Sequence, residues 1–438
     1  MGVLLSMTPK IGYVLTPQTI TKLQLLRLIY IRTLNTLDLT TYTTLIILSG
    51  LVIFSYLFDL LAGKTKIPSV ILLLLLGIGL KQIVEYFNIP MLNFSLILPT
   101  LGTLGLILIV FEGALELRYN SDKNAIIKKA FFSALSILLL SAVAITGIIY
   151  YLTGESIYKC FVNAIPYCVV SSSIAIPSAA NLIKSKKEFI IYESSFSDIL
   201  TVVLFNFIVR NPKIDIGSFA KLGGELTGII LVAILSCLAL LYVIGRLKHH
   251  IKSFLIISLL ILVYSIGQSY HLSALIIVLA LGLFLNNASQ INFSWFRRTF
   301  IYPAFKHDIK QLHQLSAESA FLMRTFFFIV FGYTMNIREL NDMPILLSAG
   351  AILLSIYIVR FVYIKLVSKT DLMPELFIVP RGLINVLLYY NLPANLRIPQ
   401  VGASLLFVVV LGTSIILSLG LLVTKRQEAA PSKEFNSV

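Results

Sequence analysis

The feature that most constrains this chain is a succession of long apolar runs, which occupies nearly all of its 438 residues. A helix that crosses a bilayer needs about 20 mostly apolar residues. The runs are continuous and do not alternate at every second residue, so they are typical of helices rather than of barrel strands. We therefore predict an all-α integral membrane protein with about thirteen transmembrane helices, near 42–62, 67–86, 95–115, 125–152, 158–183, 189–209, 221–245, 251–269, 271–287, 314–336, 344–366, 372–391 and 400–424.

The composition leaves too little charge for a water-soluble surface. Hydrophobic residues make up 58% of the chain and charged residues only 13%, against about 25% charge in soluble domains. The five histidines form no metal-ligand spacing, and the loops are too short for a catalytic domain. We therefore expect a protein that is not an enzyme and that needs no cofactor.

The charge balance predicts an orientation. The 35 Lys and Arg residues outnumber the 20 Asp and Glu residues, giving a net charge of +15. Most of this excess lies in loops after odd-numbered spans, for example at Lys184, Arg246 and Arg297. The positive-inside rule places these loops and the C-terminus in the cytoplasm, as in a multi-pass protein of the cell membrane. The excess then reflects contact with the lipid bilayer and not with nucleic acid.

Three segments outside the spans carry weaker signals. Residues 1–41 mix basic and apolar side chains, which fits either an interfacial helix or an extension with little structure. Residues 288–313 hold the only tryptophan, Trp295, beside two arginines, which fits either an interfacial helix or a linker. Residues 425–438 form a short tail.

Two of the predicted spans are interrupted near their middles. The fifth contains three consecutive serines followed by a proline, and the twelfth contains Pro-Arg-Gly. Proline breaks the helical hydrogen-bond ladder, and interrupted helices in matching positions of two halves indicate a transporter's binding site near the midplane. The spans lie seven apart, so we predict two inverted repeats whose broken helices cross there, with break residues Ser172, Ser173, Pro177, Pro380 and Gly382.

Few charged residues fall within the predicted spans. Charge at bilayer depth costs about 3 kcal/mol or more, so such residues face a cavity or a partner. Four stand out, namely Glu112, Glu193, Asp198 and Arg381. We expect the remaining charges to lie at span ends and to extend toward the membrane surface.

Helical geometry separates the two acids of the sixth span. Ser194 and Asp198 are four residues apart and share a face, whereas Glu193 and Asp198 are five apart, about 140° around the axis. We assign Asp198 and Ser194 to a cation or proton site. A buried guanidinium keeps its charge and needs an acidic partner, so we predict an ion pair between Glu193 and Arg381.

Five segments in order resemble the monovalent cation:proton antiporter superfamily, in its sodium/hydrogen exchanger branch. The similarity runs from about Tyr42 to Thr424, and its segments read KIPSVILLLLLGIGL, LIVFEGALEL, YESSFSDILTVVLF, FFFIVFGYTMNI and PRGLI. The third is similar to the branch's Glu-Ser-Leu-Leu-Asn-Asp helix.

The resemblance implies a homodimer that exchanges Na⁺, K⁺ or Li⁺ for H⁺ at Asp198. It implies a core near 95–209 and 314–424 that moves against a dimerisation part near 42–86 and 221–287. Ser194 and Ser197 then lie at the cation site and Glu112 near the cation path, while Glu193 and Arg381 match the branch's ion pair. The electrogenic branch has Asp-Asp where this chain has Ser197-Asp198, which favours electroneutral exchange.

The chain departs from the family pattern in two places. Ser197 stands where the family has asparagine, and Ala175-Ile176-Pro177 stands where the family has Thr-Asp-Pro. Because Ile176 replaces an aspartate, one side chain that could bind the cation is missing, unless serines 171–173 supply oxygens in its place. Three alternatives therefore stay open: a potassium-linked transporter of the same superfamily, a solute symporter, and a nontransporting relative on the same fold. The short tail disfavours the first, because those transporters commonly carry a cytoplasmic nucleotide-binding domain.

Overall fold

The computed structural model shows only helices as regular elements in the part of the chain that it describes. The predictions for residues 1–41 and for the tail 425–438 fall outside the described residues. The structure describes residues 46, 49–58, 60–61, 68–86, 97–117, 123–213, 215–246, 252–269, 274–291, 293–335, 342–368 and 373–423.

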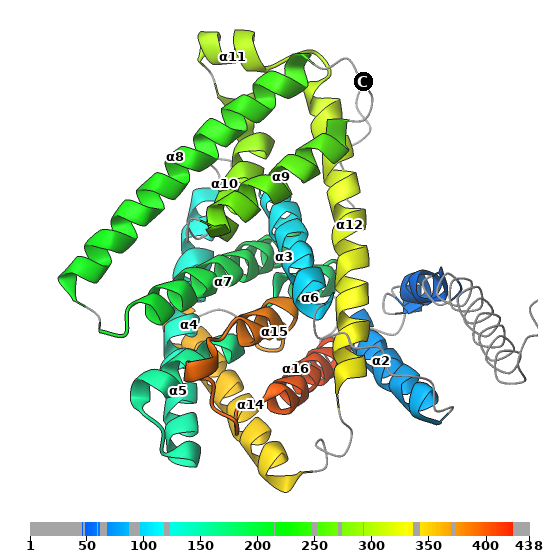
Figure 1. Cartoon of the computed structure of the whole chain (residues 1–438), viewed down its shortest axis with the longest axis vertical. Helices are drawn as coiled ribbons and strands as arrows, with labels where there is room; N and C mark the ends of the chain where they lie inside the picture. Colours follow the sequence, from blue (N-terminus) through cyan, green and yellow to red (C-terminus); the bar gives the residue numbers. More distant parts are fainter. Residues whose placement is uncertain are drawn as a thin grey trace, which may run out of the picture. The chain divides into compact units, whose positions relative to one another are not determined.

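Most helices lie along the predicted apolar runs, but one begins at Phe305, ahead of the run at 314–336, and only Leu383–Tyr390 is α-helical in the run at 372–391. An apolar helix covers Ser49–Phe58. The labelled helices of Figure 1 are α2 (Ser69–Tyr86), α3 (Ile97–Glu116), α4 (Asn124–Thr153), α5 (Ile157–Ala164), α6 (Ser172–Ser178), α7 (Lys184–Arg210), α8 (Ile216–Arg246), α9 (Lys252–Ser269), α10 (Ala274–Asn287), α11 (Ser294–Phe300), α12 (Phe305–Thr334), α14 (Met343–Tyr363), α15 (Leu383–Tyr390) and α16 (Ala403–Val423).

Seven of the described helical segments are long and apolar enough to cross a membrane. An eighth is counted if α10, with its short 3₁₀ extension, and α11 form one span with a bend of 110°. Helix α7 has the length but begins with a polar stretch rich in lysine, and α5 and α6 cross only as a pair. The count of thirteen spans, like the inverted repeats, stays a prediction.

The chain leaves helical geometry in both spans with interruptions. Between α5 and α6 a short 3₁₀ turn at Ile165–Tyr167 is followed by non-helical backbone up to residue 171. Residues 373–382 are also non-helical and lead into α15. Pro177 lies inside α6, so the first break precedes the proline and is not centred on it.

Helix α12 packs against α2 and α3 (Figure 1). Its contact with α2 is a seam of backbone on backbone at Gly77 and Gly332. A Cβ atom at Gly77 would meet the carbonyl of Ile329, and one at Gly332 would meet the carbonyl of Leu74. Small residues of this kind let membrane helices approach closely.

Helix α7 positions the candidate site. It packs against α4 on one side and against α6 on another, with smaller contacts to α3 and α15. Its middle carries most of the buried polar side chains of this region: Glu193, Ser194, Ser195, Ser197, Asp198 and Thr201. Because buried polar side chains need hydrogen-bond partners, the helices that pack against the middle of α7 must supply polar groups.

Candidate functional site

Among the described residues, Asp198 is the acid that has a buried side-chain oxygen without a hydrogen-bond partner. Its side chain is 3% exposed, and its Oδ2 accepts a hydrogen bond from the backbone N–H of Ser172 at 3.3 Å. Ser172 is the first residue of α6, where helical N–H groups lack partners within the helix. The Oδ1 atom is buried and has no hydrogen-bond partner among the described residues. A carboxylate in this state can take up a proton or a small cation.

The serines near Asp198 have different tasks. Ser197 accepts a hydrogen bond from the N–H of Val170 at 2.9 Å, which links the non-helical segment between α5 and α6 to α7. Ser194 lies on the Asp198 face, but its hydroxyl donates to the Ile190 carbonyl at 2.7 Å. The lone pairs of its oxygen remain available for a cation, while its proton is committed to the backbone.

The two breaks meet directly. The N–H of Ser171 donates to the Pro380 carbonyl at 2.9 Å. Gly382 lies against Ser171 so closely that a Cβ atom there would come within 2.6 Å of the Ser171 hydroxyl oxygen. The predicted break residues Pro380 and Gly382 therefore meet Ser171, the residue directly before Ser172, whereas Ser173 and Pro177 lie further along α6.

Asn385 joins the breaks and was missed by the sequence reasoning. Its side-chain amide donates to the carbonyls of Pro166 at 2.8 Å and Val169 at 3.1 Å, and its oxygen accepts from the N–H of Gly382 at 2.6 Å. An amide in the otherwise apolar segment LINVLLYY was the available signal. Its three bonds satisfy backbone groups that the breaks leave without helical partners.

The predicted ion pair between Glu193 and Arg381 is wrong. Glu193 instead receives two hydrogen bonds from the guanidinium of Arg360 in α14, at 2.5 and 2.7 Å, and one from Ser133 in α4 at 2.5 Å. Glu193 is 2% exposed and Arg360 is 1% exposed. The side of α7 opposite Asp198 faces α4 and α14, so the acid meets the arginine of α14.

Arg381 is fully buried but uses backbone carbonyls in place of a carboxylate. Its Nε donates to Tyr167 at 2.7 Å and its Nη1 to Val379 at 3.1 Å. Broken helices leave carbonyls without N–H partners, and a guanidinium can satisfy them. The expectation that Arg381 needs an acid failed because it left these carbonyls out.

Arg324 of α12 has a related task at Pro177. A proline lacks the N–H that would bond to the carbonyl four residues earlier, which here belongs to Ser173. Arg324 donates to that carbonyl at 2.6 Å. The expectation that all remaining charges lie at span ends is therefore wrong for Arg324. Arg360 does lie in the last turn of α14, but it is buried and does not extend toward the membrane surface. An arginine within a largely apolar stretch was the signal for each.

Glu112 and Ile176 complete the set of predicted positions. Glu112 is partly buried on α3, which contacts α7, and its neighbour Gly113 lies beside Ser195. Ile176 is partly exposed near the end of α6. No group of three His, Cys, Asp or Glu side chains able to hold a metal occurs in the described ranges.

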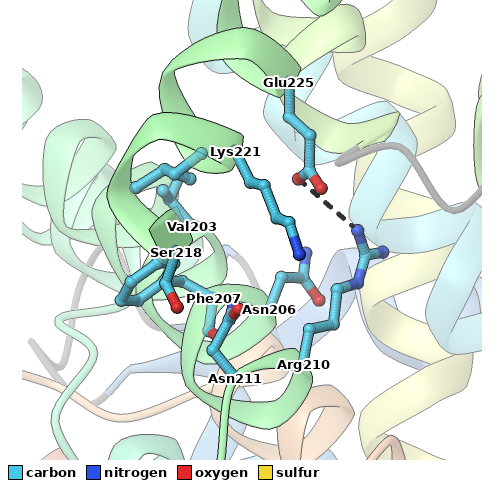
Figure 2. A pocket seen from close by; sticks show the side chains of 9 residues that line it. Val203, Asn206, Phe207, Arg210, Asn211, Ser218, Lys221 and Glu225 are labelled. Carbon is cyan, nitrogen blue, oxygen red and sulfur yellow. Dashed lines mark hydrogen bonds and ion pairs between the residues drawn. The ribbon is translucent and has the colours of Figure 1, made fainter. Parts of the chain in front are cut away.

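A separate polar cavity of about 180 Å³ lies where α7 ends and α8 begins (Figure 2). Arg210 and Lys221 point into it, and Arg210 is 3.7 Å from Glu225. At the start of α8 the hydroxyl and N–H of Ser218 donate to Asp215 and lower the pKa of that carboxyl. Twelve residues, or about 18 Å of helix, separate Asp198 from Arg210, so this cavity is distinct from the Asp198 site.

Comparison with known proteins gives one family and one fold. The profile of the sodium/hydrogen exchanger transmembrane region matches residues 49–425. Two structures of the sodium proton antiporter MjNhaP1 from Methanocaldococcus jannaschii are similar. The structure at pH 8 has 20% identity and a TM-score of 0.66, covering 86% of this chain and 98% of that one. The electron-microscopy structure has 21% identity and a TM-score of 0.61, and the match covers 85% of this chain and 93% of that one. No curated protein matches the chain.

Proposed function

The chain belongs to the sodium/hydrogen exchanger family, and from this premise we propose that it exchanges a monovalent cation, Na⁺, K⁺ or Li⁺, for H⁺ across a membrane at Asp198. One observation carries the proposal. The carboxylate of Asp198 is buried beside the crossing of the two breaks, and one of its oxygens has no partner among the described residues. A buried carboxylate is costly unless it is protonated or paired with a cation.

The exchange follows from competition at one carboxylate. Asp198 holds either a proton or a dehydrated cation, because binding both would bury a net positive charge. Moving the site while Asp198 is unoccupied would carry a bare negative charge through the barrier, which is unfavourable in the low dielectric of the membrane. Empty transit is therefore suppressed, and each movement carries a proton one way or a cation the other.

The neighbouring groups divide into ligands and supports. Ser194, Ser197 and Glu112 provide oxygens at or near the path, and the N–H of Ser172 holds Oδ2 in place. The ion pair of Glu193 with Arg360 joins α7 to α14, and the carbonyl bonds of Arg381 keep the broken segments in position. Hydroxyl, carbonyl and carboxylate oxygens are suitable ligands for hard cations.

We assign the finer architecture in the same way. The protein has thirteen spans in two inverted repeats, with a moving core and a dimerisation part that forms a homodimer. Its C-terminus lies in the cytoplasm of a cell whose plasma membrane it crosses. With one carboxylate cycling, one H⁺ moves per cation and exchange is electroneutral.

A second candidate, a nontransporting relative, is favoured by one specific position. Ile176 stands where the family segment carries aspartate, so the site lacks one polar side chain. The geometry of Asp198 favours transport, because a buried carboxylate oxygen without a hydrogen-bond partner destabilises the fold unless it binds a proton or a cation.

Proteoliposomes containing the purified full chain distinguish the two candidates. With a preset pH gradient, addition of Na⁺, K⁺ or Li⁺ should dissipate the gradient, as followed by an entrapped pH dye. Asp198→Asn keeps the shape of the side chain but removes its charge, and it should abolish the response. No response of the wild-type protein to any of the three cations between pH 5 and pH 9 would exclude the exchanger.

A further inference from the structure

We propose that the hydroxyl of Ser195 is a further ligand of the transported monovalent cation, beside Asp198, an assignment that rests on the proposed function. Ser195 was not among the residues that the sequence assigned to the site. Its position on α7 and its lack of a hydrogen-bond partner among the described residues lead to this role.

The hydroxyl of Ser195 is buried and unsatisfied. The residue is 6% exposed, and its Oγ has no hydrogen-bond partner among the described residues. The other serines of this stretch all have partners: Ser194 bonds to the Ile190 carbonyl, and Ser197 bonds to the N–H of Val170. A buried hydroxyl without a partner is costly to folding, and its oxygen is free to contact a ligand.

Ser195 and Asp198 lie on the same side of α7. They are three residues apart, which places them one turn apart and about 60° around the axis. The Oδ1 atom of Asp198 is likewise buried without a partner. Two unpaired oxygens, one of them a carboxylate oxygen, therefore lie within one turn, as a dehydrated cation requires.

The direction of the hydroxyl supports this role. A Cβ atom built at Gly113 of α3 would be 3.9 Å from the Ser195 Oγ, so the hydroxyl points at α3. Gly113 itself has no side chain to occupy that space, and Glu112 precedes it on the same helix. The oxygens of Ser195 and Asp198 thus face α3, which carries Glu112, and the start of α6, where the N–H of Ser172 donates to Asp198.

The sequence around Ser195 fits an altered ligand set. Ser195 stands where the similar family segment Glu-Ser-Leu-Leu-Asn-Asp has its first leucine, so the chain gains an oxygen there. Ile176 stands where the family has aspartate, so the chain loses one. We infer that the hydroxyl of Ser195 supplies part of the coordination that position 176 does not.

Ser195→Ala in the purified full chain tests the assignment. Two quantities are measured with Na⁺, K⁺ and Li⁺: the cation concentration for half-maximal exchange, and the concentration for half-maximal thermal stabilisation in detergent. Both should rise about fivefold for the preferred cation, equivalent to about 1 kcal/mol of lost affinity. The melting temperature without cation should stay equal to that of the wild type or rise, because an unsatisfied hydroxyl has been removed.

Ser141→Ala is the matched control. Ser141 is a buried serine of α4 whose hydroxyl also lacks a partner in the described structure, so the same substitution removes the same group outside the site. It should leave both cation concentrations unchanged. Ser195→Thr retains a hydroxyl and should recover most of the affinity that Ser195→Ala loses.

Several results would overturn the assignment. Unchanged half-maximal concentrations in Ser195→Ala, while Asp198→Asn abolishes exchange, would refute Ser195 and leave the exchanger intact. An equal loss of affinity in Ser141→Ala would show a packing effect. If no cation stabilises the wild-type protein, Ser195 has no cation to bind. Full exchange in Asp198→Asn would instead refute the proposed function.

Discussion

Glu193 and Arg360 form the most deeply buried ion pair in the described structure, with two hydrogen bonds between the guanidinium and the carboxylate. Removing one partner of such a pair leaves an isolated charge in a low-dielectric interior, which typically costs about 3–5 kcal/mol. Removing both leaves no such charge. The pair therefore predicts strongly non-additive effects on stability.

Glu193→Gln and Arg360→Gln should each lower the free energy of unfolding by about 3–5 kcal/mol, and the double variant should lose less than the sum. Unfolding of the purified proteins in mixed micelles measures the change in free energy for the two single variants and the double variant. The matched comparison combines Glu193→Gln with Arg381→Gln, which should show a smaller coupling because Arg381 bonds to carbonyls. Additive losses for Glu193 with Arg360, or stronger coupling with Arg381, would contradict the assignment.

For single residues, the sequence predicts the role of a buried charged side chain better than it predicts which residue pairs with it. The 140° between Glu193 and Asp198 follows from helix geometry alone, and it correctly separates an acid paired with arginine from an acid left half satisfied. The identity of the arginine depends on how α14 packs beside α7. No local pattern encodes that packing, and Arg360 lies close enough to the end of its apolar run to be taken for a surface residue.

The crossing of the two breaks is the feature that dominates at the scale of whole elements. Backbone lies against backbone there, through the bond from Ser171 to Pro380 and through Gly382, which packs on the Ser171 side chain. The crossing leaves no room for a side chain at position 382. An added methyl group would have to displace the side chains of Ser171 and Ile174.

Gly382→Ala should therefore lower the free energy of unfolding by about 1–3 kcal/mol, the usual range for overpacking a well-packed site. It should also slow cation-driven proton exchange, because Ser171 adjoins the residue that holds Asp198. Gly350→Ala is the control, since a Cβ atom at Gly350 of α14 meets nothing within 4 Å. Alanine favours the helix by up to about 1 kcal/mol, so that variant should be equally or more stable. Equal destabilisation of both variants would contradict the steric argument.

The positions of the elements follow from the sequence, whereas the inner geometry of the breaks does not. Long apolar runs coincide with the described helices because lipid leaves a backbone few alternatives. The first break lies before Ser172 and not at Pro177, because Arg324, from a helix distant in sequence, satisfies the carbonyl that the proline releases. Such a compensating contact is visible only once the helices are packed.

At the scale of the whole molecule, the proposed cycle with a single carboxylate predicts exchange without net charge movement. If one net elementary charge crossed the membrane, the free energy of that step would change by about 2.3 kcal/mol for each 100 mV of membrane potential. We expect the rate of Na⁺- or Li⁺-driven exchange in proteoliposomes to change by less than about twofold when a potential of either sign is imposed. Acceleration by one sign and inhibition by the other would show that a further charge moves with the site.

The sequence also predicts the class of the whole molecule. Scarce charge and repeated apolar runs indicate a multi-pass helical membrane protein, and five ordered segments lead to the family that the profile match identifies. The exact number of spans is harder to predict. Short or broken helices cross a membrane only in combination, and their length and composition do not reveal the combinations.

The glycine seam between α2 and α12 has a consequence for how the protein is made. Its two halves are separated by more than 200 residues of sequence, since α2 ends at Tyr86 and α12 begins at Phe305. At a synthesis rate of roughly 5–20 residues per second, α2 waits roughly 10–45 s for its partner to emerge from the ribosome. Throughout that interval the face around Gly77 has no α12 backbone to pack against. The seam can therefore close only late in biogenesis, after most of the chain has entered the membrane.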